Sequence, residues 1–354
     1  MKKHNFSAGP CILPREVMDK AADAVRDLDG TGLSLIEISH RSAEFVAVME
    51  RARSLVLELM DLEGKGYEVL FLQGGASMQF LMAAYNLLET RAGYINTGTW
   101  SGKAIKEARL FGEVLEVASS EADQFRSIPK GFEVPAGLDY LHLTTNNTIF
   151  GTQFKDIPQC DAPLVADMSS DIFSRSMDFS QFGLIYAGAQ KNMGPAGATL
   201  VVVREDLLGR VTRKIPSMLD YQVHISKDSM FNTPPVFAVY TSMLTLQWLK
   251  AQGGIAAMEE RNAKKAKLLY SEIDLNPLFQ GFAATADRSD MNATFTLTDP
   301  ELKDRFDQMW KAAGINGLNG HRSVGGYRAS MYNALSLESV GVLVDVMSDL
   351  ERKA

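Results

Sequence analysis

The stretch from Ile185 to Gly197 reads IYAGAQKNMGPAG, and it places a lysine directly after an apolar run. The apolar run favours a buried strand, and the glycines and proline around Lys191 favour a tightly shaped turn. An amine held in such a turn loses solvation, which lowers its pKa and lets it attack a carbonyl group. A solvated loop lysine is the alternative. The small residues around it make Lys191 the strongest nucleophile candidate in the chain.

Apolar runs of the same kind recur on both sides of this stretch and alternate with segments of helical periodicity. Strands that are apolar throughout are expected where helices cover both faces of a mainly parallel sheet. The sequence therefore predicts a large α/β domain over residues 15–251. Its candidate strands are 67–72, 94–96, 113–117, 140–143, 163–167, 184–187 and 198–204, and its candidate helices are 14–28, 42–59, 78–88 and 102–111.

Gln252, Gly253 and Gly254 interrupt this alternation. The remaining sequence predicts a smaller α+β domain over residues 252–354, to which the N-terminal segment 1–14 is added. Its candidate helices are 258–273, 301–313 and 340–350, with a β-like run over 292–298 and a glycine-rich segment over 314–326.

Composition excludes several classes of protein. Of the 354 residues, 46% are hydrophobic and 22% charged, which is typical of a globular protein with a sizeable core. Lysine and arginine number 36 against 43 acidic residues, so the formal net charge is −7 and a nucleic-acid partner is not expected. Small anionic substrates stay possible, because a few local cations are enough to hold them.

The cysteines, the histidines and the lengths of the apolar runs exclude further classes of protein. Cys11 and Cys160 are too few for a disulfide framework or a four-cysteine zinc site, and the five histidines lack metal-binding spacing, so no metal is expected. No apolar stretch is long enough to cross a membrane, and the N-terminus lacks the apolar core of a signal peptide. A cytoplasmic protein without a membrane partner is therefore expected.

The segment LQGGASM, residues 72–78, is a glycine turn between a predicted strand and a predicted helix. Free N–H groups in the first turn of a helix can bind a phosphate, and glycines let the ligand approach the backbone. The segment matches neither of the common nucleotide-binding motifs, so a plain strand-to-helix turn is an equal alternative.

Asp167 ends another apolar run, residues 162–166. An acid at the last position of a buried strand lies at the crevice where open α/β sheets bind their ligands, and there it can pair with a cationic ligand atom. An N-cap for the segment Met168–Phe173 is the alternative.

Five cationic residues form a third candidate group: His40, Arg41, His321, Arg322 and Arg328. Their arginines can bind a substrate carboxylate or phosphate through the planar guanidinium fork. Ordinary surface charge is the alternative.

Six segments in order resemble the phosphoserine aminotransferase family, which belongs to the class V aminotransferases and to the fold-type-I pyridoxal-phosphate enzymes. The resemblance covers the whole chain and implies a large mainly parallel-sheet domain with a smaller C-terminal α+β domain. The segments are NFSAGP (5–10), EISHR (37–41), LQGGAS (72–77), YAGAQKN (186–192), MFNTPP (230–235) and GHRSVGG (320–326).

The resemblance implies roles for the residues at the cofactor, pyridoxal 5′-phosphate. Lys191 would form a Schiff base with it and then move the proton between the substrate Cα and the cofactor. Asp167 would pair with the pyridine nitrogen and keep the ring an electron sink. The remaining cofactor contacts would come from Trp100 stacking on the ring, Thr148 bonding to its substituents, and Ala76, Ser77 and Gln190 holding the phosphate.

The resemblance also implies a homodimer with shared active sites, because Asn232 and Thr233 would reach the cofactor phosphate of the neighbouring subunit. Arg328 would bind the substrate α-carboxylate, and the other four cationic residues its distal phosphate or carboxylate. Some relatives carry Gly-Arg where this chain has Ala76 and Ser77, so a phosphate contact from that arginine is absent here.

The function that follows is reversible transamination of 3-phosphohydroxypyruvate with L-glutamate, giving O-phospho-L-serine and 2-oxoglutarate in serine biosynthesis. Pyridoxine biosynthesis is a possible second use. The alternatives are another class V enzyme, such as an alanine–glyoxylate aminotransferase or a cysteine desulfurase, and a pyridoxal-phosphate-binding protein without turnover. A desulfurase usually needs a reactive loop cysteine, for which Cys11 and Cys160 have no obvious context.

Overall fold

A computed structural model describes residues 3–353 as a mixed α/β fold whose largest sheet has seven strands in the order β2-β8-β7-β6-β5-β3-β4. Neighbouring strands are parallel except at β8, which is antiparallel to both β2 and β7. The prediction of a mainly parallel sheet is therefore confirmed. The strands are β2 (Tyr67–Leu72), β3 (Arg91–Asn96), β4 (Glu113–Ser119), β5 (Leu141–Thr144), β6 (Leu164–Asp167), β7 (Phe182–Gly188) and β8 (Thr199–Arg204).

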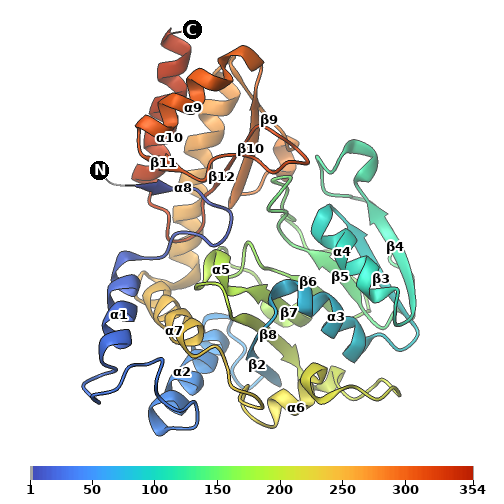
Figure 1. The fold of residues 1–354 in the computed structure, drawn as a ribbon. Coiled ribbons are helices and arrows are strands. Elements are labelled where there is room, and N and C mark those ends of the chain that lie inside the picture. Colours follow the sequence, from blue (N-terminus) through green and yellow to red (C-terminus); the bar gives the residue numbers. More distant parts are fainter. Residues whose placement is uncertain (1–2, 354) are drawn as a thin grey trace.

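Helices cover both faces of this sheet (Figure 1). One face packs against α1 (Arg15–Arg26), α2 (Ala43–Leu59) and α7 (Val236–Ala251), and the other against α3 (Gly75–Leu87) and α4 (Thr99–Ala108). Alternate residues of one strand pack on opposite faces of the sheet. In β8, Leu200 and Val202 pack on the face covered by α1, α2 and α7, and Val201 and Val203 on the face covered by α3 and α4. This two-sided burial explains why the strands are apolar throughout.

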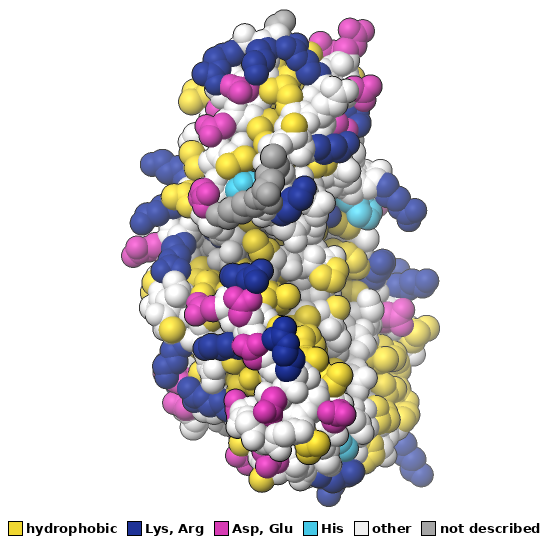
Figure 2. Space-filling model, turned by 60° about the vertical axis from the view of Figure 1, so that its left-hand side comes forward, with side chains coloured by type: hydrophobic (Ala, Val, Ile, Leu, Met, Phe, Trp, Pro, Cys, Tyr) yellow, Lys and Arg dark blue, Asp and Glu magenta, His cyan; other side chains and the backbone are white. Residues whose placement is uncertain are grey.

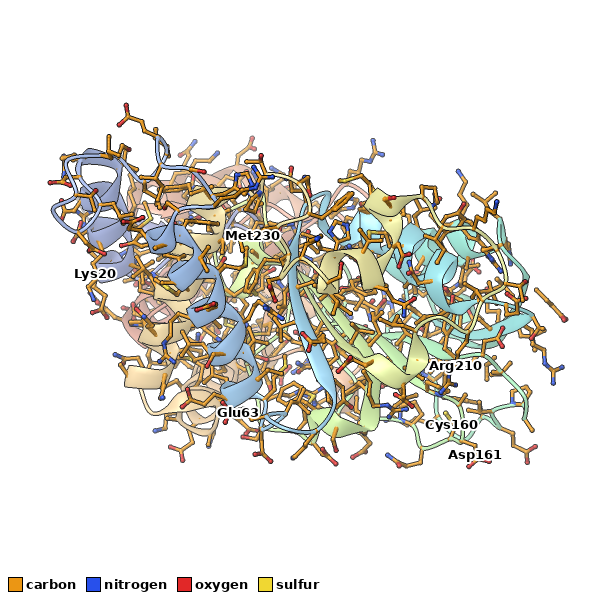
Figure 3. The ribbon with its side chains drawn as sticks, turned by 90° about the horizontal axis from the view of Figure 1, so that it is seen from below. Lys20, Glu63, Cys160, Asp161, Arg210 and Met230 are labelled. Carbon is orange, nitrogen blue, oxygen red and sulfur yellow. The ribbon has the colours of Figure 1, made fainter. Side chains whose placement is uncertain are left out.

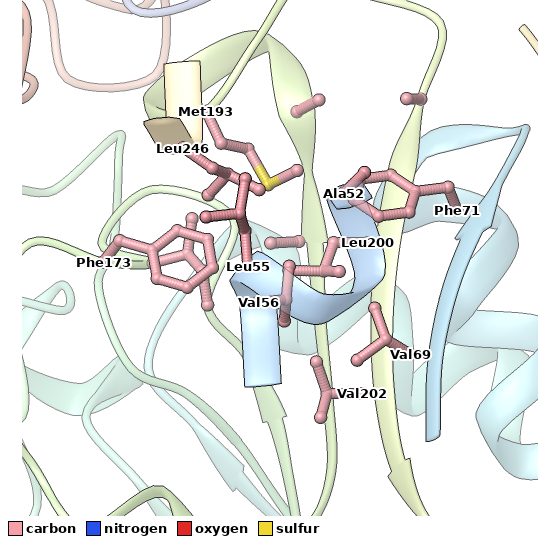
Figure 4. Packing of buried hydrophobic residues seen from close by; sticks show 14 of the residues in the cluster. Ala52, Leu55, Val56, Val69, Phe71, Phe173, Met193, Leu200, Val202 and Leu246 are labelled. Atoms are coloured by element: carbon pink, nitrogen blue, oxygen red, sulfur yellow. The ribbon is translucent and has the colours of Figure 1, made fainter. Parts of the chain in front are cut away.

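The packing of α2 on the sheet shows how the sequence pattern produces the core. Figure 4 shows Ala52, Leu55 and Val56 of α2 lying against Val69 and Phe71 of β2 and Leu200 and Val202 of β8. The Ser42 side chain accepts a hydrogen bond from the Phe45 amide and caps the helix, so the predicted helix over 42–59 is confirmed. Burying this stripe removes apolar surface from water, which is the main stabilising contribution to the fold.

The helix α7 was not predicted from the sequence. Its residues Ala238–Leu246 are buried without interruption, so it has no polar face and no amphipathic period to recognise. Three short helical segments near the site were also not predicted: α5 (Ala189–Asn192), α6 (Tyr221–Ile225) and the 3-10 turn Ser217–Leu219.

The C-terminal elements form a second lobe, which Figure 1 shows above the large sheet. Its antiparallel sheet has the order β12-β10-β9, and the N-terminal strand β1 (His4–Asn5) pairs in parallel with β11 (Ile315–Asn316). Phe6 is buried in the core of this lobe, which brings the two ends of the chain together. The elements are β9 (Phe279–Gly281), β10 (Asn292–Leu297), β12 (Tyr327–Ser330), α8 (Gly254–Leu275), α9 (Lys303–Ala312) and α10 (Leu337–Lys353).

The division into domains 15–251 and 252–354, with 1–14 added to the second, stays a prediction. Of the helices within residues 3–353, none has the length and apolar character needed to cross a membrane.

A buried lysine fastens α8 to the end of β12. Lys265 is only 1% exposed, and its Nζ donates hydrogen bonds to the carbonyls of Met331 at 2.8 Å and Tyr332 at 2.7 Å. Burial lowers the pKa of Lys265 to about 7 from an ordinary value of 10.5. The charged form is therefore disfavoured in the folded chain.

We expect Lys265→Met to change how stability depends on pH. Between about pH 7 and 10.5 the unfolded chain binds a proton at Lys265 that the folded chain does not bind. The free energy of unfolding that Lys265 contributes should therefore rise with pH across this window, by roughly 1 kcal/mol per pH unit. Urea unfolding of wild type and Lys265→Met should give a stability difference with this slope. A difference that stays constant across the window contradicts the lowered pKa.

Candidate active site

One edge of the large sheet gathers the residues that the sequence singled out. Strands β3, β5, β6 and β7 are parallel, and β2 runs the same way because both β2 and β7 are antiparallel to β8. Their carboxyl ends therefore lie at the same edge, where open α/β sheets bind ligands. At or just after these ends come Ala76 and Ser77, Trp100, Thr148, Asp167, and Gln190 and Lys191.

Lys191 is the centre of this group. It lies in α5, immediately after β7, and its Nζ donates a hydrogen bond to Thr148 Oγ1 at 2.9 Å. The same Nζ lies 5.6 Å from the ring centroid of Trp100. Burial lowers the pKa of Lys191, while the nearby Asp167 carboxylate acts against the shift. The structure thus brings Lys191, Thr148 and Trp100 together, although they are far apart in the sequence.

Asp167 is the last residue of β6 and is 4% exposed. Burial raises the pKa of its carboxyl, and the positive charge of Lys191 opposes this. Its Oδ1 accepts a hydrogen bond from the Ser169 amide at 2.9 Å, so it also fixes the turn that follows. Residues 169–173 form turns, so the alternative of an N-cap for a helix over Met168–Phe173 is wrong.

The turn between β2 and α3 is shaped by two glycines in left-handed conformation. Gly74 has φ 94° and Gly75 has φ 65°, and a Cβ on Gly74 would lie 2.5 Å from Met78 Cβ. The helix begins at Gly75, earlier than the predicted residue 78, and this places Ala76 and Ser77 in its first turn. Amides there have no acceptor within the helix and can bind an anion.

Arg328 connects the second lobe to Lys191. It lies on β12, and its Nη1 donates a hydrogen bond to the carbonyl of Thr148 at 3.2 Å. Its Nε is buried and has no hydrogen-bond partner in the described part of the chain, and burial lowers the pKa of the guanidinium.

His321 lies close to three cationic side chains. Burial lowers the pKa of His321, and the charges of Arg328, Arg322 and Lys103 lower it further. The structure thus groups three of the five predicted cationic residues and adds Lys103, which the sequence analysis did not single out.

His40 and Arg41 are not joined to that group within one chain. Arg41 is exposed, and His40 is 9% exposed, with no hydrogen-bond partner for its Nε2 among the described residues. In the part of the chain that the structure describes, no hydrogen bond or ion pair links either residue to His321, Arg322 or Arg328.

The segment with Asn232 and Thr233 lies beside the β2–α3 turn of its own chain. The Thr233 carbonyl accepts a hydrogen bond from Gln73 Nε2 at 2.9 Å. A cavity of about 310 Å³ lies here, lined in part by Gly74, Met78 and Asn232.

The N-terminal segment supplies contacts to Lys191 that the residue pattern did not predict. The Cys11 amide donates to the Gln190 carbonyl at 3.0 Å, and Cys11 Sγ donates to the Lys191 carbonyl. A Cβ on Gly9 would lie 3.4 Å from Lys191 Cγ. Burial raises the pKa of the Cys11 thiol to about 12, so it stays protonated at neutral pH. Only the resemblance over residues 5–10 pointed to this region.

Comparison with known proteins agrees with this geometry. A family model described as aminotransferase class-V matches residues 3–343, nearly the whole chain. The fold and site are therefore those of a class-V aminotransferase, an enzyme class that works with pyridoxal 5′-phosphate.

Full-length relatives define the group within this class. Phosphoserine aminotransferase from Flavobacterium johnsoniae is 64% identical, with 100% of both chains covered. The structure of phosphoserine aminotransferase from Bacillus circulans subsp. alkalophilus is 45% identical, with 99% of both chains covered and a TM-score of 0.96. A phosphoserine aminotransferase studied for radiation damage of its Schiff base is also 45% identical, with full coverage and a TM-score of 0.96. The chain belongs to the phosphoserine aminotransferase family of the class-V aminotransferases.

The residues present fit pyridoxal 5′-phosphate. Lys191 offers an amine of lowered pKa, Asp167 a buried carboxyl, and the first turn of α3 free amides. Next to this group, Trp100 Nε1 is a buried donor for which residues 3–353 supply no acceptor. The site therefore offers an amine for the aldehyde, donors for the phosphate, and a carboxyl for the pyridine nitrogen.

Proposed function

We propose that this enzyme transfers the amino group between L-glutamate and 3-phosphohydroxypyruvate, giving O-phospho-L-serine and 2-oxoglutarate. The observation that carries the proposal is the path from Lys191 Nζ through Thr148 to Arg328, with the cations near His321 beyond it. A carbonyl substrate bound near Lys191 would then have its α-carboxylate near Arg328 and its distal anion near His321 and Arg322. Its proposed setting is cytoplasmic serine biosynthesis, and use in pyridoxine biosynthesis stays a prediction.

The proposed residue roles follow from chemistry and position. When bound, pyridoxal phosphate supplies an aldehyde carbon and a ring that withdraws electrons from the substrate Cα. Lys191 Nζ holds the cofactor and, once free, removes and returns the Cα proton, a role that its lowered pKa suits. Asp167 stabilises a protonated pyridine nitrogen. We assign contacts with the cofactor ring and phosphate to Ala76, Ser77, Trp100, Thr148, Gln190, Asn232 and Thr233.

The alternative activities fit less well. Cys11 is a protonated thiol held against the Lys191 carbonyl, which disfavours a nucleophilic role. Cys160 precedes β6, at the sheet edge opposite Lys191, and Figure 3 shows it with Asp161 at the periphery. Glyoxylate has no distal anion to occupy the cations near His321. A protein without turnover would not need Lys191 and Asp167 together.

A homodimer with shared sites is part of the proposal. Met78, Met218 and Phe231 are exposed beside the cavity at Asn232, with 36%, 49% and 37% of their surfaces accessible. Figure 2 shows hydrophobic side chains gathered on one side of the lower part of the molecule. Exposed apolar patches of this kind favour a protein interface. A second copy that covers this surface would place its own Asn232 and Thr233 near the β2–α3 turn of the first copy. The Asn232 and Thr233 of the first copy would in turn lie near the site of the second.

Mixing inactive subunits tests the shared site. Lys191→Ala subunits exchanged with subunits changed at both Asn232→Ala and Thr233→Ala should form mixed dimers with one intact site. We expect about a quarter of wild-type activity, because about half the dimers are mixed and each has one complete site. Each variant alone is the control. If mixing restores no activity although mixed dimers form, each site is built within one chain.

Arginine substitutions test the substrate. Arg322→Ala should lower kcat/KM for 3-phosphohydroxypyruvate by roughly 10- to 100-fold, because it removes a charge-assisted hydrogen bond to the distal phosphate. We expect the same of Arg41→Ala through the proposed dimer, in which Arg41 of one copy would reach the site of the other, since no hydrogen bond or ion pair joins Arg41 to Arg322 or Arg328 within the described part of one chain. The value of kcat/KM for glyoxylate should fall far less. Arg328→Ala should instead lower kcat/KM for every acceptor, because all of them carry the α-carboxylate that Arg328 would bind. Unchanged preference between the two acceptors in Arg41→Ala and Arg322→Ala contradicts the phosphorylated substrate.

A further inference from the structure

Lys103 is an exposed cation beside Trp100, and none of the roles proposed above involves it. It lies on α4, three residues after Trp100, and its Nζ is 4.6 Å from the ring centroid of Trp100. Lys191 Nζ lies 5.6 Å from the same centroid. One indole ring therefore lies within contact distance of both amines, so Lys103 is close to the reacting end of the site although it is on the surface.

Lys103 also belongs to a group of basic side chains around His321. Its charge acts on His321 together with the charges of Arg322 and Arg328. Across residues 3–353, none of these four side chains forms an ion pair with a carboxylate. Arg328 donates to the Thr148 carbonyl, and its buried Nε has no hydrogen-bond partner among residues 3–353. Like charges gathered without counter-ions repel one another, and an anionic ligand relieves this repulsion.

The position of Lys103 is suited to an anion that enters with the substrate. The large lobe supplies Lys103 through α4, and the second lobe supplies Arg328 through β12 and His321 and Arg322 through the preceding loop. A lysine has a flexible stem and three donors, so its ammonium can leave the ring of Trp100. An exposed cation–π contact is weaker than a charge-assisted hydrogen bond to phosphate. It is therefore favourable for Lys103 to leave the ring of Trp100 and to donate to a phosphate instead.

We propose that Lys103 binds the distal phosphate of the substrate and helps the enzyme to prefer dianionic over monoanionic substrates. The proposal rests on the proposed function, since it concerns the same site. The ammonium of Lys103 would contact the phosphate from the side of the large lobe, opposite Arg322. Lys103 would thus be a specificity-determining residue that does not take part in the proton transfer.

Kinetic comparison of two lysines on one helix tests this. Lys106 is also exposed on α4, one turn further from Trp100, and provides the matched control. Lys103→Met should lower kcat/KM for 3-phosphohydroxypyruvate by about 10-fold and for glyoxylate by less than about 2-fold. Lys106→Met should change neither value, and Lys103→Arg should restore most of the loss. Equal effects of Lys103→Met on the two acceptors overturn the proposal.

A binding measurement on the holoenzyme is independent of turnover. The His321 proton resonance, assigned with a His321→Asn variant, is followed while inorganic phosphate is added. Phosphate should shift this resonance at concentrations several-fold lower in wild type and Lys106→Met than in Lys103→Met. Equal midpoints in all three proteins overturn the proposal.

The two measurements separate failure of this proposal from failure of the proposed function. If wild type forms no phosphoserine but phosphate binding depends on Lys103, the anion site stands and the proposed substrate is wrong. If wild type forms phosphoserine and Lys103→Met behaves as Lys106→Met does, only the role of Lys103 is wrong.

Discussion

Lys191→Ala is expected to reduce turnover by more than roughly 10⁴-fold while the chain still folds. The substitution removes the amine that attaches the cofactor and the group that carries the Cα proton, so two functions are lost together. The fold should persist, because Lys191 Nζ contributes one hydrogen bond, to Thr148, and its burial disfavours the charged amine. Steady-state transamination and thermal unfolding of the same preparation measure the two effects.

Borohydride reduction followed by peptide mass spectrometry adds a readout of attachment. Wild type should carry the reduced cofactor on the peptide containing Lys191, and Lys191→Ala should carry none. Lys265→Met is a control for the loss of another buried lysine and should keep the modification. Near-wild-type turnover of Lys191→Ala, or modification of another lysine in wild type, contradicts the assignment.

Asp167→Asn should lower kcat by about 10²- to 10⁴-fold with a much smaller loss of cofactor affinity. The amide keeps the shape and can still accept from the Ser169 amide, but it cannot stabilise a positive charge on the pyridine nitrogen. Binding of the cofactor through its phosphate should persist at the first turn of α3. Measurement of kcat and of cofactor dissociation for the same variant separates the two contributions.

Asp171 offers a matched control for this variant. It is a second buried acid, with hydrogen bonds from Thr145 and Gln153, and burial raises its pKa as it does that of Asp167. Asp171→Asn should lower the free energy of unfolding, and its effect on kcat should be the smaller of the two. If Asp167→Asn loses cofactor affinity and kcat in equal proportion, Asp167 only supports binding or the local turn.

Local patterns in the sequence predicted the large sheet and the amphipathic helices. The run Ala198–Arg204 and the stripe of α2 carry their own periodicity, so β8 and α2 were expected close to where they are found. The helix α7 was missed because its residues 238–246 are buried without interruption. The start of α3 was placed late because the left-handed Gly74 and Gly75 form the turn that begins it.

The site was predictable only in part, since proximity depends on topology. Lys191 and Asp167 could be identified because each ends an apolar run, and the parallel sheet then brings such ends together. Trp100 and Thr148 came from the resemblance alone. The contacts of Cys11 with Lys191 join residues 180 positions apart, and no local pattern reports them. The same holds for Lys103, whose environment depends on the second lobe.

This enzyme is proposed to move the amino group of glutamate to a phosphorylated keto acid at Lys191. The most direct test is nitrogen NMR of a reaction of ¹⁵N-labelled L-glutamate with equal amounts of 3-phosphohydroxypyruvate and glyoxylate. With wild type, the label should appear mainly in O-phospho-L-serine, and with Lys191→Ala it should stay in glutamate. Label that enters glycine at an equal or higher rate, or that is transferred by Lys191→Ala, contradicts the account.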